Sequence, residues 1–345
     1  MNIQDRPQIV ALTSSRAIAA VLVVIHHYGW NVYPFNLAPV FFRNGNLAVS
    51  YFFVLSGFVL YNAHVNKSLD YGAYLRKRAA RILPLYYVGL LLTVGVLCLI
   101  PPLPLNMRQQ VVYGALLIQS YIPSYPLSLN LPAWSISVEL FFYLLFPLLL
   151  FLEQRKRNLF LLIWFMAFIA AQYFHLKYYE QRHELSDDIV DTIFFNPVIH
   201  VSQFMTGMIG GYLYARIADK KEWPRYIPVL MSIIIGVIIV FKPGSMSYHT
   251  GLLAPLFLLL IIALAKSKTP ILDLPFFVFL GEISYGVYIL QYPVYRGLEI
   301  LNGRYYTLNP IMFFYSSFLV LMLTTIGMHY FVDRPLGKLI RGKSQ

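Results

Sequence analysis

Arg16 and the pair His26 and His27 interrupt the first apolar stretch of the sequence, residues 9–30. Of these, Arg16 and His27 are spaced to act together. The eleven residues from Arg16 to His27 make about three helical turns plus about 20°, so both side chains lie on one face of a helix, about 16 Å apart along its axis. His26 points about 80° away from that face. Such groups in a membrane helix usually face the bundle interior or a watery cavity. The alternative is that Arg16 extends to one interface while the histidines lie among the lipid headgroups.

A carboxylate, Glu139, lies in a second apolar stretch that reads LPAWSISVELFFYLLFP. It is predicted about 10 Å below the membrane surface, at a depth similar to that of His27. A carboxylate beside an imidazole fixes its tautomer and stabilises the imidazolium, as in general-base catalysis on a hydroxyl group. A purely structural buried pair, or a neutral hydrogen-bonded Glu139, is the alternative.

Two further pairs are spaced three residues apart. Arg78 and Arg81, within YLRKRAARILPLYY, share one side of a helix and suit phosphate oxygens. The alternative for them is an ordinary cationic patch facing anionic lipid. Tyr288 and Gln291, within LGEISYGVYILQYPV, predict a polar stripe that lines a cavity or bonds to a neighbouring helix.

Composition identifies the elements that must hold these groups. The chain has 345 residues, of which 58% are hydrophobic and 12% charged, whereas soluble domains carry about 25% charged residues. We therefore predict an all-α, polytopic transmembrane bundle, a single domain over residues 1–345 without a fused soluble domain or a cleaved signal peptide. A shorter apolar segment, 111–121, is predicted to be an interfacial or re-entrant helix. The ten predicted spans are 9–30, 46–65, 84–101, 132–152, 159–176, 196–215, 227–241, 249–265, 275–295 and 310–332.

The distribution of charge predicts orientation and partners. With a cytoplasmic amino terminus, 20 of the 27 lysines and arginines fall on the inner side, so both termini are predicted to be cytoplasmic. The net charge is +12, but no soluble domain is predicted that could present a basic face to nucleic acid. Membrane lipids are the expected partners. The acidic segment 180–191 predicts a solvated outer loop. One cysteine, Cys98, excludes a disulfide framework, and no metal or nucleotide motif is present.

Together these stretches resemble the acyltransferase 3 family of integral-membrane acyltransferases. The resemblance rests on six elements in order, namely Arg16 with ten residues before His27, AVSYFFVLSGF, RAARILPLYY, WSISVELFFYLLFP, GEISYGVYILQYPV and FVDRPL. It implies ten core helices and a bacterial inner membrane. It also implies acyl transfer from acyl-CoA, most simply acetyl-CoA, to a sugar hydroxyl of a surface polysaccharide, a lipid-linked glycan or a glycosylated small molecule.

Residue roles follow from the resemblance. His27 corresponds to the base, and Arg78 with Arg81 to a pair that serves donor recognition or structure. The chain departs from many members at Ser50, where they have aspartate, at Gln291, where they have histidine, and at Asp333, where they have glutamate.

The predicted mechanism is O-acylation in which His27 accepts the acceptor's proton and Glu139 orients or stabilises it, while Arg16 balances negative charge. Ser137, Tyr143, Tyr288 and Gln291 are expected to bind donor or acceptor. The rival hypothesis is a proton-coupled transporter of an anionic or acyl compound that uses Arg16, His27 and Glu139. A third is a non-catalytic scaffold or flippase partner.

Overall fold

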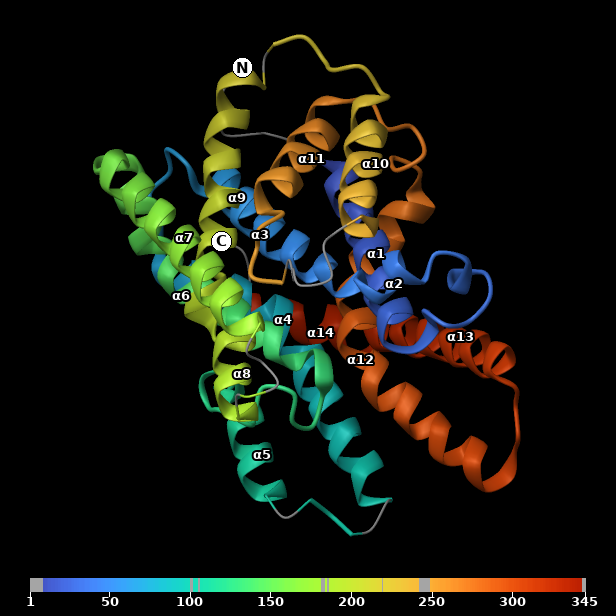
Figure 1. The fold of residues 1–345 in the computed structure, drawn as a ribbon. Coiled ribbons are helices and arrows are strands. Elements are labelled where there is room, and N and C mark those ends of the chain that lie inside the picture. Colours follow the sequence, from blue (N-terminus) through green and yellow to red (C-terminus); the bar gives the residue numbers. More distant parts are fainter. Residues whose placement is uncertain are drawn as a thin grey trace.

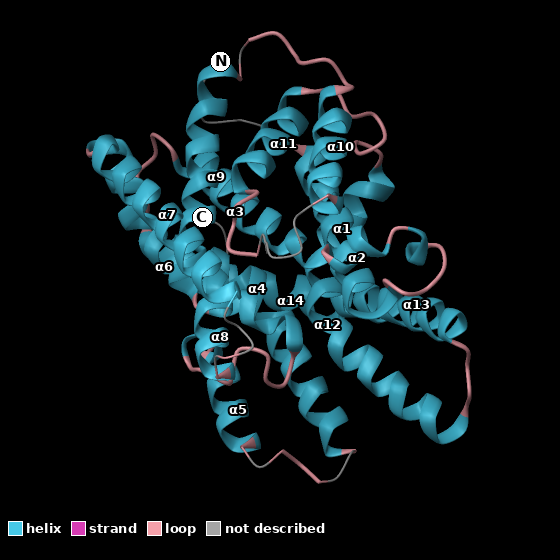
Figure 2. Ribbon diagram, in the orientation of Figure 1, coloured by secondary structure: helices cyan, strands magenta, loops and turns pink. Residues whose placement is uncertain are grey.

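The computed structural model describes residues 9–99, 102–104, 106–180, 184, 186–218, 220–241 and 249–342. Within these ranges the regular structure is helical (Figure 2), and the β-type pairing is an isolated bridge between Trp223 and Ser267. The predicted all-α class is confirmed for this part of the chain.

The helices follow one another in a chain of hairpins (Figure 1). They are α1 (Val10–Val24), α2 (Pro39–Arg43), α3 (Ala48–His64), α4 (Tyr71–Cys98), α5 (Met107–Ala115), α6 (Trp134–Arg155), α7 (Arg157–Glu180), α8 (Asp187–Phe195), α9 (Pro197–Ile217), α10 (Ile227–Val240), α11 (Ala254–Lys266), α12 (Pro275–Tyr305), α13 (Pro310–Met328) and α14 (Arg334–Arg341).

Six helical segments in the described residues are long and apolar enough to cross a membrane. They contain α1, α3, α4, α6, α7 and α13. The other four predicted spans correspond to α9, α10, α11 and α12. With 14 and 13 residues, α10 and α11 are each only about 20 Å long, shorter than the roughly 30 Å hydrocarbon layer. The chain is a membrane protein, and ten spans remain a prediction.

Helix α4 differs from prediction in a way that affects the site. It begins at Tyr71, well before residue 84, because the Asp70 carboxylate caps it by accepting a hydrogen bond from the Ala73 backbone N–H at 3.0 Å. Arg78 and Arg81 therefore belong to the same continuous helix as the apolar span. Hydropathy does not find this start, because the first turns of α4 are cationic.

Two smaller predictions are corrected. The apolar segment 111–121 is not one helix, since α5 ends at Ala115 and a separate turn covers residues 119–121. The acidic outer loop contains the short helix α8, whose Ile193 is buried. An apolar face of α8 packs onto the bundle. The prediction of a solvated loop was based on the carboxylates of this segment.

Close backbone approaches hold the central helices together. A Cβ atom on Gly281 of α12 would lie 2.0 Å from the Thr13 carbonyl oxygen of α1. Helices α3 and α9 approach each other through a reciprocal pair, in which Gly57 meets the Phe204 carbonyl and Gly207 meets the Val54 carbonyl. Side chains at these positions would force the helices apart. The α1–α12 contact matters most here, because it sets His27 beside Gln291.

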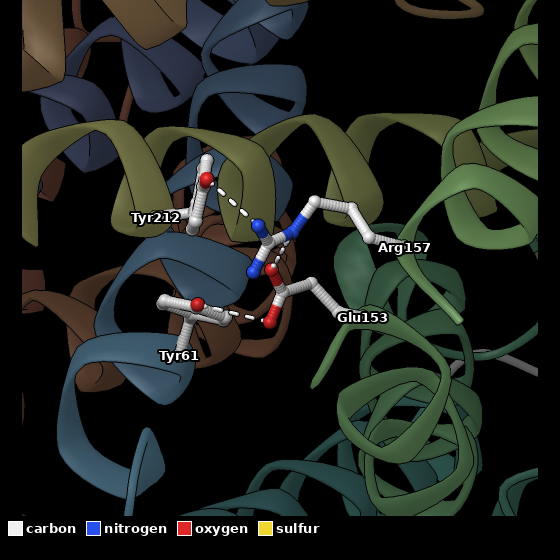
Figure 3. Close-up of polar contacts among 4 residues, drawn as sticks. All are labelled: Tyr61, Glu153, Arg157 and Tyr212. Atoms are coloured by element: carbon white, nitrogen blue, oxygen red, sulfur yellow. Dashed lines mark hydrogen bonds and ion pairs between the residues drawn. The ribbon is translucent and has the colours of Figure 1, made fainter. Parts of the chain in front are cut away.

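An ion pair with one buried partner joins four helices (Figure 3). The Glu153 carboxylate, 2% exposed, accepts hydrogen bonds from Arg157 Nε at 3.0 Å and from the Tyr61 hydroxyl at 2.9 Å. Arg157 also donates to the Tyr212 hydroxyl at 2.8 Å. The cluster joins α3, α6, α7 and α9 and is structural, because its polar groups satisfy one another.

Candidate active site

A polar cavity of about 80 Å³ lies where α1, α3, α4, α6 and α12 converge. Its charged lining side chains come from three helices. Arg16 comes from α1, Arg78 and Arg81 from α4, and Glu139 from α6. Further polar lining comes from Ser135, Tyr143, Ser284, Tyr285 and Tyr288.

The cavity carries excess positive charge. Among the described residues, no carboxylate lies within 4.0 Å of a nitrogen of Arg16, Arg78 or Arg81. Arg78 Nε is buried and has no hydrogen-bond partner within that part of the chain. One carboxylate, Glu139, faces three guanidinium groups, so the site has unused donors for an anion.

Tyr143 links the carboxylate to the cations. Its hydroxyl donates a hydrogen bond to Glu139, and its ring centroid lies 5.7 Å from the guanidinium carbon of Arg78. Tyr143 is buried, with 2% of its surface exposed. The predicted site residues Glu139, Tyr143 and Arg78 thus form one connected group.

His27 has a different partner. Its Nδ1 lies 2.8 Å from Gln291 Oε1, and Gln291 Nε2 donates to the Tyr288 carbonyl oxygen at 2.7 Å. Because a carbonyl can only accept, the Gln291 amide nitrogen must face Tyr288 and its oxygen must face His27. Nδ1 of His27 therefore carries the proton, and the lone pair is on Nε2, which makes no hydrogen bond with a described residue.

Tyr288 connects the histidine to the cavity. Its backbone carbonyl binds Gln291, while its side chain lines the cavity and its hydroxyl lies 2.7 Å from Ser135 Oγ. Gln291 is fully buried and Tyr288 is 5% exposed, so their rotamers are held by packing. The orientation of the imidazole is consequently set by α12.

The turn that carries the histidines is irregular. Helix α1 ends at Val24 and continues as a π-helical turn over Ile25–Gly29. Such turns are frequent at functional sites. The turn is wider than 3.6 residues, so the ideal α-helical angle between Arg16 and His27 does not apply. The structure lines the cavity with Arg16 and directs His27 to Gln291.

The expected pairing of His27 with Glu139 is not made. Within the described residues, the hydrogen bond of Glu139 comes from Tyr143 and that of His27 involves Gln291. Similar depth in the membrane did not fix which helices would be neighbours. The carboxylate lies instead with the arginines.

Ser137 also differs from expectation. Its hydroxyl donates to the Leu117 carbonyl oxygen and lies 3.3 Å from Gln119 Oε1, so it anchors the α5–α6 connection and does not line the cavity. Conversely, Ser135 was not predicted as a site residue although it lines the cavity. Ser135 and Ser137 are two residues apart on α6, so their side chains point about 200° apart. The sequence does not show which of these two faces turns toward the cavity.

Comparison with known proteins identifies the family of this chain. A family model described as an acyltransferase domain matches residues 9–330. Acyltransferase MdmB of Streptomyces mycarofaciens is 29% identical over 279 residues, covering 75% of this chain and 71% of the relative. O-acetyltransferase OatA of Staphylococcus aureus is 22% identical over a 361-residue alignment, covering 95% of this chain and 57% of the relative. No solved structure matches.

The family match spans nearly the whole chain and includes every helix that lines the cavity. It also favours an enzyme over a transporter. The chain therefore belongs to the acyltransferase 3 family and is a membrane acyltransferase.

Proposed function

We propose that this protein moves an acyl group, most simply acetyl, from acyl-CoA to a sugar hydroxyl of a surface polysaccharide, a lipid-linked glycan or a glycosylated small molecule. The observation that carries the proposal is the fixed tautomer of His27, which leaves Nε2 free to act as a base, while Gln291 and Tyr288 connect the histidine to the arginine-lined cavity. Similarity to a protein named O-acetyltransferase supports oxygen as the acceptor atom.

The arginines suit the donor. Coenzyme A carries phosphate groups, and guanidinium groups bind phosphate oxygens well. Arg81 is exposed, whereas Arg16 and Arg78 are partly buried, so the cations extend from the surface into the cavity. We infer that the phosphates stay near Arg81 and that the narrow thioester end enters the small cavity.

The chemical step is a balanced acyl transfer. Nε2 of His27 takes the proton from the acceptor hydroxyl as its oxygen attacks the thioester carbonyl carbon. The tetrahedral intermediate collapses, the carbon–sulfur bond breaks, and the imidazolium returns the proton to the leaving thiolate. The products are an ester and free coenzyme A. Arg16 would balance negative charge on the bound donor.

Gln291 replaces Glu139 in the orienting role. In this proposal Glu139 partly balances the three arginines and holds Tyr143, while Gln291 fixes the His27 tautomer. A neutral amide orients the ring without a full charge beside it. The remaining predicted binding residue, Tyr288, transmits the orientation of α12 and bounds the cavity.

Cellular placement follows from the same hypothesis. The donor is made inside the cell, so the arginine side of the bundle would face the cytoplasm, with both termini, as the positive-inside distribution predicts. The acceptor would approach His27 from the outer side. We place the protein in the inner membrane of a bacterial cell, with ten helices crossing it.

Variants at Gln291 test the orienting role. Gln291→Leu removes the acceptor for Nδ1–H and should lower kcat about 100-fold, within the range of general-base effects. Gln291→Glu keeps an acceptor but adds a charge that stabilises the imidazolium, so activity should persist with its acidic limb moved to higher pH. The pH–rate profile of each variant measures both effects. If the acidic limb of Gln291→Glu coincides with that of the wild type, Gln291 does not orient His27, because a packing defect alone would not move this limb.

The function itself is tested with purified protein in nanodiscs. Acetyl-CoA and a candidate glycan should yield equal amounts of free coenzyme A and acetylated glycan, measured by thiol assay and mass spectrometry. Coenzyme A release without glycan modification would contradict the acceptor. Solute uptake into sealed vesicles with no covalent product would instead support the transporter.

A further inference from the structure

An apolar cavity of about 1,020 Å³ lies on the other side of α1 from the polar site. It is bounded by α1, α2, α3, α10, α11 and the segment after α11. One face of α10 lines it, through residues at helical spacing, namely Val229, Ser232, Ile235, Gly236 and Ile239. Figure 1 shows these helices gathered at one end of the bundle.

The apolar lining of this cavity does not favour ordered water as its occupant. Several lining side chains, namely Ile18 at 50%, Tyr226 at 63% and Val229 at 58%, are exposed, so the cavity opens to the surface of the bundle, where a lipid chain can enter it. A water molecule needs two to four polar partners, which an apolar wall does not give. The occupant should therefore be a flexible apolar chain.

The charged lining side chains identify the head of that occupant. Among the described lining residues, the cations are Arg225 and Lys268, and both lie at the same end of the cavity. The two segments that carry them are joined, because Trp223 N–H donates to the Lys266 carbonyl at 2.9 Å and Ser267 Oγ to the Pro224 carbonyl at 3.3 Å.

The carboxylates near these cations are Glu222 and Asp273, and Asp273 accepts a hydrogen bond from the lining residue Thr269 at 3.2 Å. Lys268 has an acidic neighbour, Glu222, at 3.5 Å, but both side chains are largely exposed, so the pair is weak. Arg225 has no carboxylate within 4.0 Å among the described residues. Near Gly236, in the second half of α10 and away from Arg225, the lining residues Phe41, Phe42 and Asn44 carry no charge.

We propose that this cavity is a lipid site that holds an acyl chain of an anionic phospholipid, with the phosphate headgroup at Arg225 and Lys268. The α10 face from Ile227 to Ile239 extends about 18 Å, comparable with a long acyl chain. Basic pockets between membrane helices bind anionic headgroups. The inner wall includes Ser15 and Tyr51, whose hydroxyls lie 2.5 Å apart, so the lipid packs directly against the helix that carries Arg16.

Native mass spectrometry tests the site. The protein is released from nanodiscs with equal phosphatidylglycerol and phosphatidylcholine, and should retain one phosphatidylglycerol in at least fivefold preference. Ser232→Trp places a bulky ring halfway along the α10 face that lines the cavity, where it obstructs an acyl chain, and should abolish retention. Ile233→Trp is the matched control, because that neighbouring side chain is 57% exposed on another face of α10 and should retain lipid normally.

A charge variant separates the headgroup from the tail. Arg225→Gln with Lys268→Gln leaves the apolar walls intact, so it should still retain lipid but lose the preference for phosphatidylglycerol. This variant also decides the question if Ser232→Trp does not fold. Equal retention of both lipids by the wild type, or an isoprenoid mass in place of a phospholipid, would overturn the proposal. So would unchanged preference in the charge variant.

Discussion

Replacing His27 with alanine is expected to lower kcat for acyl transfer about 1,000-fold while the protein still inserts into the membrane. General-base catalysis contributes roughly 100- to 10,000-fold, and the His27 imidazole has an Nε2 lone pair that makes no hydrogen bond with a described residue. Initial rates of coenzyme A release, with purified protein in nanodiscs, measure this loss. The KM for acetyl-CoA should change little, because His27 does not line the arginine cavity.

His26 supplies the matched control. It is the adjacent residue on the same π-helical turn, with its ring centroid 5.0 Å from that of His27. It has no hydrogen bond to Gln291 and no place in the cavity lining. His26→Ala should keep most of the activity. Equal losses in the two variants would mean that the turn, and not the base, was damaged.

Neutralising the α4 arginines is expected to raise the KM for acetyl-CoA, by about 10-fold for Arg78→Gln or Arg81→Gln and by about 100-fold for the double variant. A hydrogen bond to a charged group is worth about 1.5–3 kcal/mol, and each 1.4 kcal/mol is tenfold in affinity. The dependence of KM on salt should weaken in parallel, since fewer charges remain to be screened. Steady-state kinetics over a range of ionic strength gives both quantities.

Arg76 is the control for this series. It lies on the same helix, two residues before Arg78, is exposed and does not line the cavity. Arg76→Gln should leave KM within about twofold of the wild type. If all three single variants raise KM equally, α4 acts as a general cationic surface for membrane or donor. If none does, the donor binds elsewhere.

The sequence predicted the components of this site better than their connections. Six of the predicted site residues line one cavity, as expected for polar and charged side chains in apolar helices. They are Arg16, Arg78, Arg81, Glu139, Tyr143 and Tyr288. Which of them touch depends on how helices pack, and depth estimates carry no such information. Gln291 beside His27 requires α1 and α12 to be in contact, and that contact is set by the Gly281 approach to Thr13.

Local irregularities explain the other differences. The π-helical turn at Ile25–Gly29 has no obvious sequence pattern, so an ideal helix was assumed between Arg16 and His27. The early start of α4 is explained by the Asp70 cap, which hydropathy does not register. The class of fold needed neither detail, because a chain so rich in long apolar stretches has few alternatives to a helical membrane bundle.

The most direct test compares surface glycans from cells that make the wild type or His27→Gln at equal levels. Mass spectrometry should show glycans heavier by one acetyl, or one longer acyl group, only with the wild type, while purified His27→Gln still binds acetyl-CoA with wild-type affinity. Acylated glycans at wild-type abundance in the variant cells would contradict a base at position 27.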